Sequence, residues 1–377
     1  MAYPPYDPFR GRTSRSRQQA RQPRRLPLPL LIAVVVLPVL VVSTFLFWQT
    51  RGGDDSVGTS SAAASTADPR GETAAPSEIA SGTAAVLGAA EAPSPEATEA
   101  NAAPPTSLGI PAPELSAASA IVVDDASMEV LYALDAYSPR PPASVTKMAT
   151  AVVALERGRL DDVVKSTVHY WDLAYEADST TMGLIPGDEV TLRELIYGLL
   201  LVSGNDAAEM IANHISGSKE AFVAEMNALA ERLGMEHTHF VTVDGLSAEG
   251  HVSSPWDLVL LSRYLMRFPD LREIVGTEEY TARGIRDGEE ASYDLYNHNP
   301  LLNYTPGVDG IKTGYTEEAG RTYSVTVERD GHRVFIVLMD SVLRAQDAQA
   351  IIEWTYENHI WPGDTAPPSG EQTSTAP

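Results

Sequence analysis

Apolar positions near both ends of the region after residue 115 form short β-branched runs. Residues 119–124 and 129–134 make one pair, and residues 322–328 and 332–339 make a second pair around Asp330-Gly331. Asp-Gly between two such runs is a strong signal for a tight β-hairpin. The pattern therefore predicts two antiparallel hairpins, one at each end of the folded region.

Between these hairpins, apolar residues recur at helical spacing. Helices are predicted over residues 144–156, 191–202, 206–215, 219–233 and 255–268, and a last helix over 345–358 follows the second hairpin. This order predicts an α+β fold. An antiparallel sheet built from the N- and C-terminal strands would be flanked by helices, with an α-rich subdomain inserted between the strands.

The N-terminal 48 residues predict a membrane anchor. Residues 1–25 contain seven arginines and one aspartate, and residues 26–48 are apolar and uncharged. The second segment is long enough to cross a bilayer, and the arginines before it place the N-terminus in the cytoplasm. We expect a basic cytoplasmic arm, an uncleaved single-pass transmembrane helix, and a remainder that lies outside the cytoplasm.

Composition divides the rest of the chain into a spacer, one domain and a tail. Residues 49–114 are rich in Ala, Ser, Thr, Pro and Glu and have few large apolar side chains, so a disordered tether is expected. Residues 115–362 are enough for one catalytic domain, and the polar residues 363–377 are expected to be a disordered tail.

Charge and cysteine content exclude several classes of function. The formal net charge is −24 although the N-terminal arm is basic, so the outward-facing part is strongly acidic and no nucleic-acid partner is expected. The chain has no cysteine, which excludes thiol catalysis and Cys-ligated zinc. The closest histidine pair, His237 and His239, lacks the His-Glu-x-x-His pattern, so neither a metal site nor a cofactor is predicted.

Candidate chemistry begins at Ser144-Val145-Thr146-Lys147, where an apolar helix starts. A serine at this place is often a simple helix N-cap. Residues three apart share a helix face, however, so Lys147 would project beside the Ser144 hydroxyl. Burial next to a second cation, for which Lys312 is the candidate, would lower the pKa of Lys147 and let it accept the hydroxyl proton.

A second motif, Ser203-Gly204-Asn205, lies between two predicted helices. These residue types often end one helix and begin the next, which is the simplest explanation of the motif. In a catalytic interpretation, Ser203 relays a proton to the leaving amine. Asn205 would then bind a substrate amide and the Lys147 ammonium.

The third motif, Lys312-Thr313-Gly314, is predicted to form an edge strand beside the site. Glycine would let a substrate backbone approach closely, and Lys312 and Thr313 would donate to a carboxylate. The backbone N–H of Tyr315 would complete an oxyanion hole with that of Ser144.

In this order the three motifs resemble those of penicillin-binding proteins and class A β-lactamases. Residues 179–187, 199–207 and 309–316 make the chain similar, more specifically, to low-molecular-mass penicillin-binding proteins of the D-alanyl-D-alanine carboxypeptidase family. The resemblance covers roughly residues 115–360 and implies a β-lactamase/transpeptidase-like fold. Members of that family often carry a second, β-rich domain and a C-terminal amphipathic helix that binds the membrane. In this chain the N-terminal span would replace that helix as the membrane anchor.

The resemblance also implies roles for individual residues. Ser144 would be the acylated nucleophile, Lys147 its base, Ser203 the proton relay and Lys312 a substrate contact. Arg344, at the start of the last helix, would bind the terminal carboxylate of the substrate.

The implied reaction is hydrolysis of the terminal D-Ala-D-Ala bond of peptidoglycan stem peptides at the bacterial cell membrane, with the catalytic domain extracytoplasmic. β-Lactams would acylate the same serine. Three alternatives remain open at this point: a D,D-endopeptidase acting on cross-links, a class A-like β-lactamase, and a non-catalytic wall-binding or β-lactam-sensing module. Gly204, where class A enzymes have aspartate, disfavours the β-lactamase.

Overall fold

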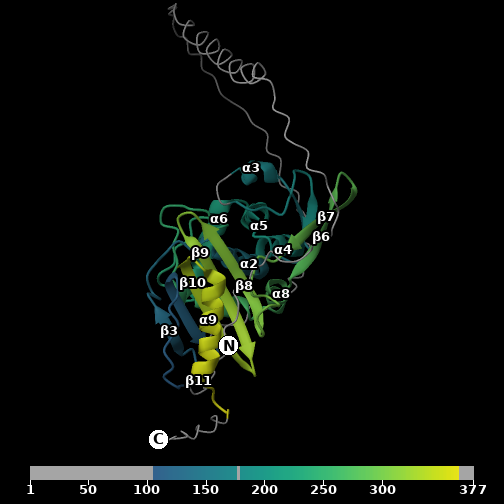
Figure 1. The fold of residues 1–377 in the computed structure, drawn as a ribbon. Coiled ribbons are helices and arrows are strands. Elements are labelled where there is room, and N and C mark those ends of the chain that lie inside the picture. The colour runs from purple at the N-terminus through teal and green to yellow at the C-terminus, as the bar shows by residue number, and fades with distance from the viewer. Residues whose placement is uncertain (1–104, 176–178, 365–377) are drawn as a thin grey trace, which may run out of the picture. The chain divides into compact units, whose positions relative to one another are not determined.

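The computed structural model describes residues 105–175 and 179–364 (Figure 1). The predicted basic arm, the membrane helix, nearly all of the tether and most of the tail lie outside the described residues. Among the helices in the described part of the chain, none has both the length and the apolar character needed to cross a bilayer.

A five-stranded antiparallel sheet forms the centre of the fold, in the order β3-β2-β10-β9-β8. Its strands are β2 (Ala117–Asp124), β3 (Val130–Leu134), β8 (Val308–Thr316), β9 (Gly320–Arg329) and β10 (His332–Ser341). N- and C-terminal strands therefore meet in one sheet, through β2 and β10, which confirms the predicted architecture. β8, which carries the third motif, is an edge strand as predicted.

The predicted hairpin turn between β9 and β10 has the backbone that its sequence favours. Asp330 and Gly331 both have positive φ, 52° and 84°. A two-residue type I′ turn requires this at both central positions, and Asp-Gly provides it at low cost.

The two faces of the sheet pack against different helices. Val122 and Ile336 belong to a core shared with α9 (Arg344–Asn358), which lies along one face in Figure 1. Residues of opposite parity, such as Ile121 and Val337, belong to the larger core that contains α2 (Lys147–Arg157) and α7 (Pro255–Leu265). The period-two alternation of the strands thus fixes which helices cover each side.

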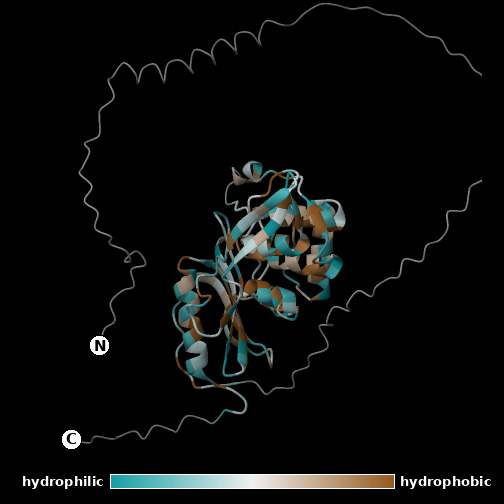
Figure 2. Ribbon diagram, turned by 90° about the vertical axis from the view of Figure 1, so that its right-hand side faces the viewer, coloured by the Kyte–Doolittle hydropathy of each residue, from teal (hydrophilic) through white to brown (hydrophobic). Residues whose placement is uncertain are grey.

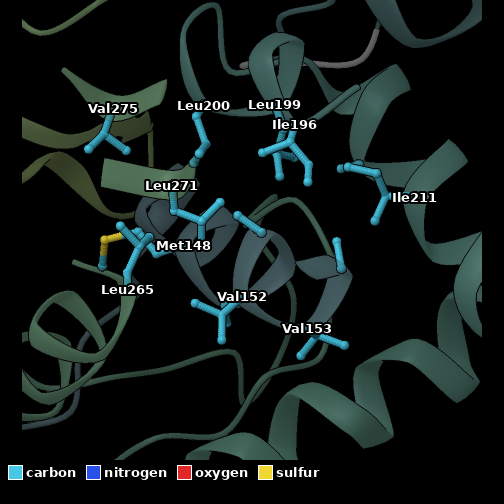
Figure 3. Packing of buried hydrophobic residues seen from close by; sticks show 14 of the residues in the cluster. Met148, Val152, Val153, Ile196, Leu199, Leu200, Ile211, Leu265, Leu271 and Val275 are labelled. Carbon is cyan, nitrogen blue, oxygen red and sulfur yellow. The ribbon is translucent and has the colours of Figure 1, made fainter. Parts of the chain in front are cut away.

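Helix α2 forms the centre of the helical part and is buried from Lys147 through Ala154. Around it in Figure 3 lie side chains from α4, α5, α7 and α8, and hydrophobic segments are concentrated in this region of Figure 2. The surrounding helices are α4 (Leu192–Leu200), α5 (Asn205–Ser216), α6 (Lys219–Arg232) and α8 (Pro269–Val275), with the short α3 (Tyr170–Ala174) near α5. α2 is buried on all sides in this stretch, and its first residue, Lys147, is the last residue of the first motif.

Three parts of the structure differ from the sequence-based predictions. The inserted subdomain also contains a four-stranded antiparallel sheet, formed by β4 (Val163–Lys165), β5 (Glu189–Thr191), β6 (Glu279–Arg286) and β7 (Glu289–Tyr296). The helix predicted to reach residue 268 ends at Leu265, and a separate helix, α8, begins at Pro269. Within the predicted tether, β1 (Thr106–Ser107) pairs with β11 (His359–Ile360), so ordered chain begins before residue 115.

Candidate active site

Ser144 lies in a short 3-10 helix, η2 (Ala143–Thr146), that leads directly into α2. The N-cap of η2 is Pro142, and no side chain caps either helix, so the simple prediction of Ser144 as an N-cap is wrong. Ala143 immediately before it has a positive φ of 49°. An alanine in this disfavoured region indicates a backbone held by its surroundings, as is common beside reacting groups.

The Lys147 ammonium has three hydrogen-bond partners. Its Nζ donates to Ser144 Oγ at 3.0 Å, to Asn205 Oδ1 at 2.7 Å and to the Asp244 carbonyl at 2.6 Å. An amide oxygen and a carbonyl can only accept, so they retain the two N–H groups of a neutral amine. The lone pair of that amine then points at Ser144 Oγ, which is the geometry of a base that removes the hydroxyl proton.

Burial lowers the pKa of Lys147 to about 8, and the nearby carboxylates of Asp244 and Asp206 oppose this shift. Desolvation is therefore the main cause, as expected from burial, whereas the expected effect of Lys312 as a second cation on Lys147 does not contribute. The neighbouring-cation effect falls on Lys312, whose pKa is lowered first by burial and then by Lys147 and Arg344. A pKa near 8 leaves a usable fraction of neutral Lys147 at neutral pH.

Besides the charge of its side chain, Asp244 acts on Lys147 through its main-chain carbonyl, and the loop that presents this carbonyl packs on η2. A side chain at Gly245 would place its Cβ 2.0 Å from the Ala143 carbonyl oxygen, so only glycine fits there. On the far side, Val243 O accepts from Thr150 Oγ1 at 2.5 Å. The loop therefore contacts η2 at Ala143 and α2 at Thr150. These two contacts hold the third hydrogen-bond acceptor of Lys147 in place.

The second motif forms a strained connection between α4 and α5. Ser203 has a positive φ of 64°, and its buried hydroxyl has no hydrogen-bond partner among the described residues. Its carbonyl accepts from Thr180 Oγ1 at 2.8 Å, and the Asn205 amide nitrogen donates to Ser179 Oγ at 2.9 Å. An unsatisfied hydroxyl beside the cavity fits a group that acts when substrate is bound.

The loop beside this motif is held by Asp206, which directly follows it in sequence. The Asp206 carboxylate accepts from the backbone N–H groups of Met182, Gly183 and Leu184 at 2.9 to 3.0 Å. Burial nevertheless raises the pKa of Asp206, and these hydrogen bonds oppose the rise. Ser179 and Thr180 are thereby kept against the cavity.

The third motif places a buried cation and a close backbone contact on β8. Lys312 is buried and donates to the Thr313 carbonyl at 2.8 Å. A Cβ on Gly314 would lie 2.3 Å from Thr322 Oγ1 and 2.9 Å from Ser144 N. Glycine therefore lets β8 lie directly beside the nucleophile. The close approach of a substrate backbone, which the sequence suggested, stays a prediction.

Arg344 begins α9 and donates from Nη1 to the Gly314 carbonyl at 2.8 Å. It contributes to a cavity of about 270 Å³, whose lining includes eight further residues: Ser144, Ser179, Thr180, Ser203, His298, Thr313, Gly314 and Tyr315. All three motifs and Arg344 thus come together, although they are up to 200 positions apart in sequence. The oxyanion role of the Tyr315 N–H stays a prediction.

Three parts of the site were not predicted from the sequence. His298 lines the cavity, and burial together with Lys312 and Arg344 lowers its pKa to about 4, so its ring is neutral at neutral pH. Ser179 contacts Asn205, and the Asp244 carbonyl contacts Lys147. His298 follows two polar strands, and Asp244 acts through a carbonyl oxygen. Neither feature has a recognisable pattern in a single sequence.

The geometry defines a class of chemistry: acyl transfer to a serine hydroxyl, with a buried lysine as base and hydrogen-bond donors around the cavity. Among the described residues, no group of three or more histidine or acidic side chains is placed to hold a metal ion.

Comparison with known proteins identifies the family. Residues 106–342 match the peptidase S11 family of D-alanyl-D-alanine carboxypeptidases. D-alanyl-D-alanine carboxypeptidase DacF of Bacillus subtilis is 34% identical over 228 residues, which are 59% of this chain and 57% of that protein. DacD of Escherichia coli is 35% identical over 258 residues, 65% and 64% of the two chains. The chain belongs to the peptidase S11 family.

A solved structure agrees with this assignment. The crystal structure of the Streptomyces K15 DD-transpeptidase is 30% identical, with a TM-score of 0.64, and the match covers 66% of this chain and all of that one. The mixed fold with an antiparallel sheet is therefore the transpeptidase-like fold that the sequence motifs implied. The chain spans 57% and 64% of the lengths of the two carboxypeptidases it matches.

Proposed function

We propose that this protein is a serine-type D-alanyl-D-alanine carboxypeptidase that removes the terminal D-alanine from peptidoglycan stem peptides. The observation that carries the proposal is the contact of Lys147 Nζ with Ser144 Oγ, with the other two Lys147 partners able only to accept. The names of the relatives support the choice of substrate. β-Lactams, which present an acylating amide, would react with the same serine.

The proposed reaction begins with proton transfer from Ser144 to neutral Lys147 and attack of Oγ on the carbonyl of the scissile bond. The backbone N–H groups of Ser144 and Tyr315 would stabilise the oxyanion. Lys147 or Ser203 would return the proton to the leaving D-alanine. Water then releases the shortened peptide from Ser144.

Arg344 is placed to select substrates with a free terminal carboxylate. It lines the cavity beside Gly314, whose carbonyl it binds, and it lies close enough to the buried Lys312 to lower the pKa of that lysine. The positive charge of Arg344 on the cavity wall favours an anionic group there. An endopeptidase, whose substrate continues beyond the scissile bond, would make less use of Arg344.

The proposal predicts that the chain releases D-alanine from a pentapeptide ending in D-Ala-D-Ala, and that Arg344→Ala weakens this turnover. Loss of a charge-assisted contact should remove about 1.5 to 3 kcal/mol of transition-state stabilisation. This corresponds to a decrease in kcat/KM of roughly 10- to 150-fold. The same peptide with an amidated terminus should be almost indifferent to the change. Lys312→Ala should instead impair both substrates, because it also changes the electrostatics around Lys147.

Arg344→Gln is the matched control, since it keeps an N–H donor for the Gly314 carbonyl and removes the charge. It should resemble Arg344→Ala on the free acid. Equal losses on both peptides for Arg344→Ala would remove this residue from carboxylate recognition. Muropeptide digestion analysed by mass spectrometry distinguishes a carboxypeptidase from an endopeptidase. Cleavage of cross-links without release of D-alanine would contradict the carboxypeptidase assignment.

We also propose that residues 26–48 anchor the protein in the membrane and place the catalytic domain outside the cytoplasm. The support is the apolar segment behind seven arginines. Membrane fractionation with protease added to intact cells tests this topology. Protection of the catalytic domain from external protease would contradict it.

A further inference from the structure

A row of aromatic rings lies on and beside α3, outside the active-site cavity. His169 stacks on Tyr170 with ring centroids 5.5 Å apart, Tyr170 lies 4.9 Å from Trp171, and Trp171 lies 6.1 Å from Tyr175. Their interplanar angles are 22°, 30° and 28°, so the rings are close to parallel. We call these four residues the α3 aromatic row.

The α3 aromatic row is not part of the hydrophobic core. α3 has no buried residue, and neither core cluster contains a member of the row. Trp171 is 51% exposed and Tyr175 is 84% exposed. His169 and Tyr170 are half-buried. Large rings exposed like those of Trp171 and Tyr175 usually mark a binding surface, because in the free protein they leave apolar area in water.

The row is attached to a segment that lines the active site. Tyr170 N donates to the Leu184 carbonyl at 2.8 Å, and Leu184 N in turn donates to Asp206. Tyr175 is only four positions before Ser179, which lines the catalytic cavity. Four residues of chain span at most about 14 Å, so the Cα of Tyr175 lies within that distance of the Cα of Ser179.

From this placement we infer that the α3 aromatic row binds the neutral amino-sugar strand to which the stem peptide is attached. The inference rests on the proposed function. About four stem residues separate the sugar from the scissile bond, and an extended chain advances about 3.4 Å per residue, which gives about 14 Å. An extended stem is therefore as long as the largest possible separation between Tyr175 and Ser179 at the cavity, so a stem peptide bound at Ser144 has the length to bring its sugar to this end of the row.

The chemistry of the row fits a sugar ring. Pyranoses present flat faces of C–H groups, which carry partial positive charge and pack on the negative face of an aromatic ring. Within the row, Trp171 and Tyr175 are the rings exposed enough to make such a contact. An anionic lipid surface fits less well, because residues 105–364 hold 18 basic and 41 acidic residues and would be repelled by it.

The test uses the full-length protein and two substrates that differ only in the sugar: a disaccharide-pentapeptide and the free pentapeptide. The double variant Trp171→Ala/Tyr175→Ala should raise KM for the disaccharide-pentapeptide about tenfold, at little change in kcat, from the loss of two stacking contacts. KM and kcat for the free pentapeptide should stay as in the wild type. The variant Trp171→Phe/Tyr175→Phe, which keeps both rings, should retain the wild-type KM for both.

Tyr304→Ala is the control, because Tyr304 is 76% exposed and belongs to neither the row nor the cavity. It should change neither substrate. Two results would overturn the inference: an equal effect of the double alanine variant on both substrates, or no effect on the disaccharide-pentapeptide. A row that binds a membrane instead of a sugar predicts no effect on the disaccharide-pentapeptide. Failure of the wild-type protein to release D-alanine from either substrate would instead contradict the proposed function. In that case, calorimetric binding of a soluble N-acetylated glycan to wild-type and variant protein decides the inference separately.

Discussion

Replacing Lys147 with arginine should abolish acylation of the protein by a labelled penicillin. Arginine keeps the positive charge, but its guanidinium does not lose a proton in proteins, so it cannot accept one from Ser144. Loss of a general base typically costs a factor of 10² to 10⁴, and we expect about a thousandfold slower labelling. The rate of formation of the labelled protein, followed by gel fluorescence, measures it.

Lys147 is fully buried, so the larger arginine could also disturb packing. Lys147→Met is therefore the companion variant, because methionine has a similar length, adapts to irregular space and carries no charge to bury. It should fold with a cooperative thermal transition and still fail to acylate. Labelling at the wild-type rate in either variant would show that Lys147 is not the base.

Gly314→Ala should also remove most activity, through geometry instead of proton transfer. The added Cβ would lie 2.3 Å from Thr322 Oγ1, 2.9 Å from Ser144 N and 3.0 Å from Ala143 Cβ, so β8 or η2 must move. A displacement of about 1 Å at a reacting group can cost on the order of a hundredfold in rate. Second-order acylation rate constants for wild-type and variant protein provide the measurement.

Gly331→Ala is the control for this prediction. Gly331 lies in the β9–β10 turn with a positive φ of 84°, and no atom lies within 4 Å of the position that a Cβ would take there. Alanine at this place should cost about 1 kcal/mol of stability from backbone strain and leave the acylation rate unchanged. Near wild-type acylation by Gly314→Ala would mean that β8 does not pack closely against Ser144.

Local sequence signals were sufficient where the chemistry depends on side chains at fixed spacing. Ser144 and Lys147 are three positions apart and do meet, and Asn205 does contact the Lys147 ammonium, as the motifs predicted. The β9–β10 hairpin followed from Asp330-Gly331. For the Ser144–Lys147 pair and the hairpin, a short stretch of sequence determines the local geometry by itself, whereas Asn205 is 58 positions from Lys147 and was assigned from its motif.

Other features depend on contacts that a single sequence does not reveal. β6 and β7 are joined by Asp287-Gly288, both with positive φ, and the pair has the same hairpin signal as β9–β10. Their mostly polar, exposed residues hid the strands, because apolar alternation is weak where little of a sheet is buried. His298 follows β7, so its place in the cavity was hidden with that sheet.

The third hydrogen-bond acceptor of Lys147 could not be predicted from the sequence for another reason. Asp244 contributes a carbonyl oxygen, which every residue type possesses, so its identity carries no information about this role. What the sequence does carry is Gly245, the residue that lets the loop approach Ala143. Its importance becomes visible only when the two segments are seen in contact.

The proposed mechanism depends above all on Ser144 being the residue that becomes acylated. Tandem mass spectrometry of the protein after reaction with a β-lactam and proteolysis tests this without intermediate steps. We expect one covalent adduct, located on Ser144 in the peptide that also contains Lys147, and no adduct in Ser144→Ala. A stoichiometric adduct on another residue, or undiminished labelling of Ser144→Ala, would contradict the mechanism.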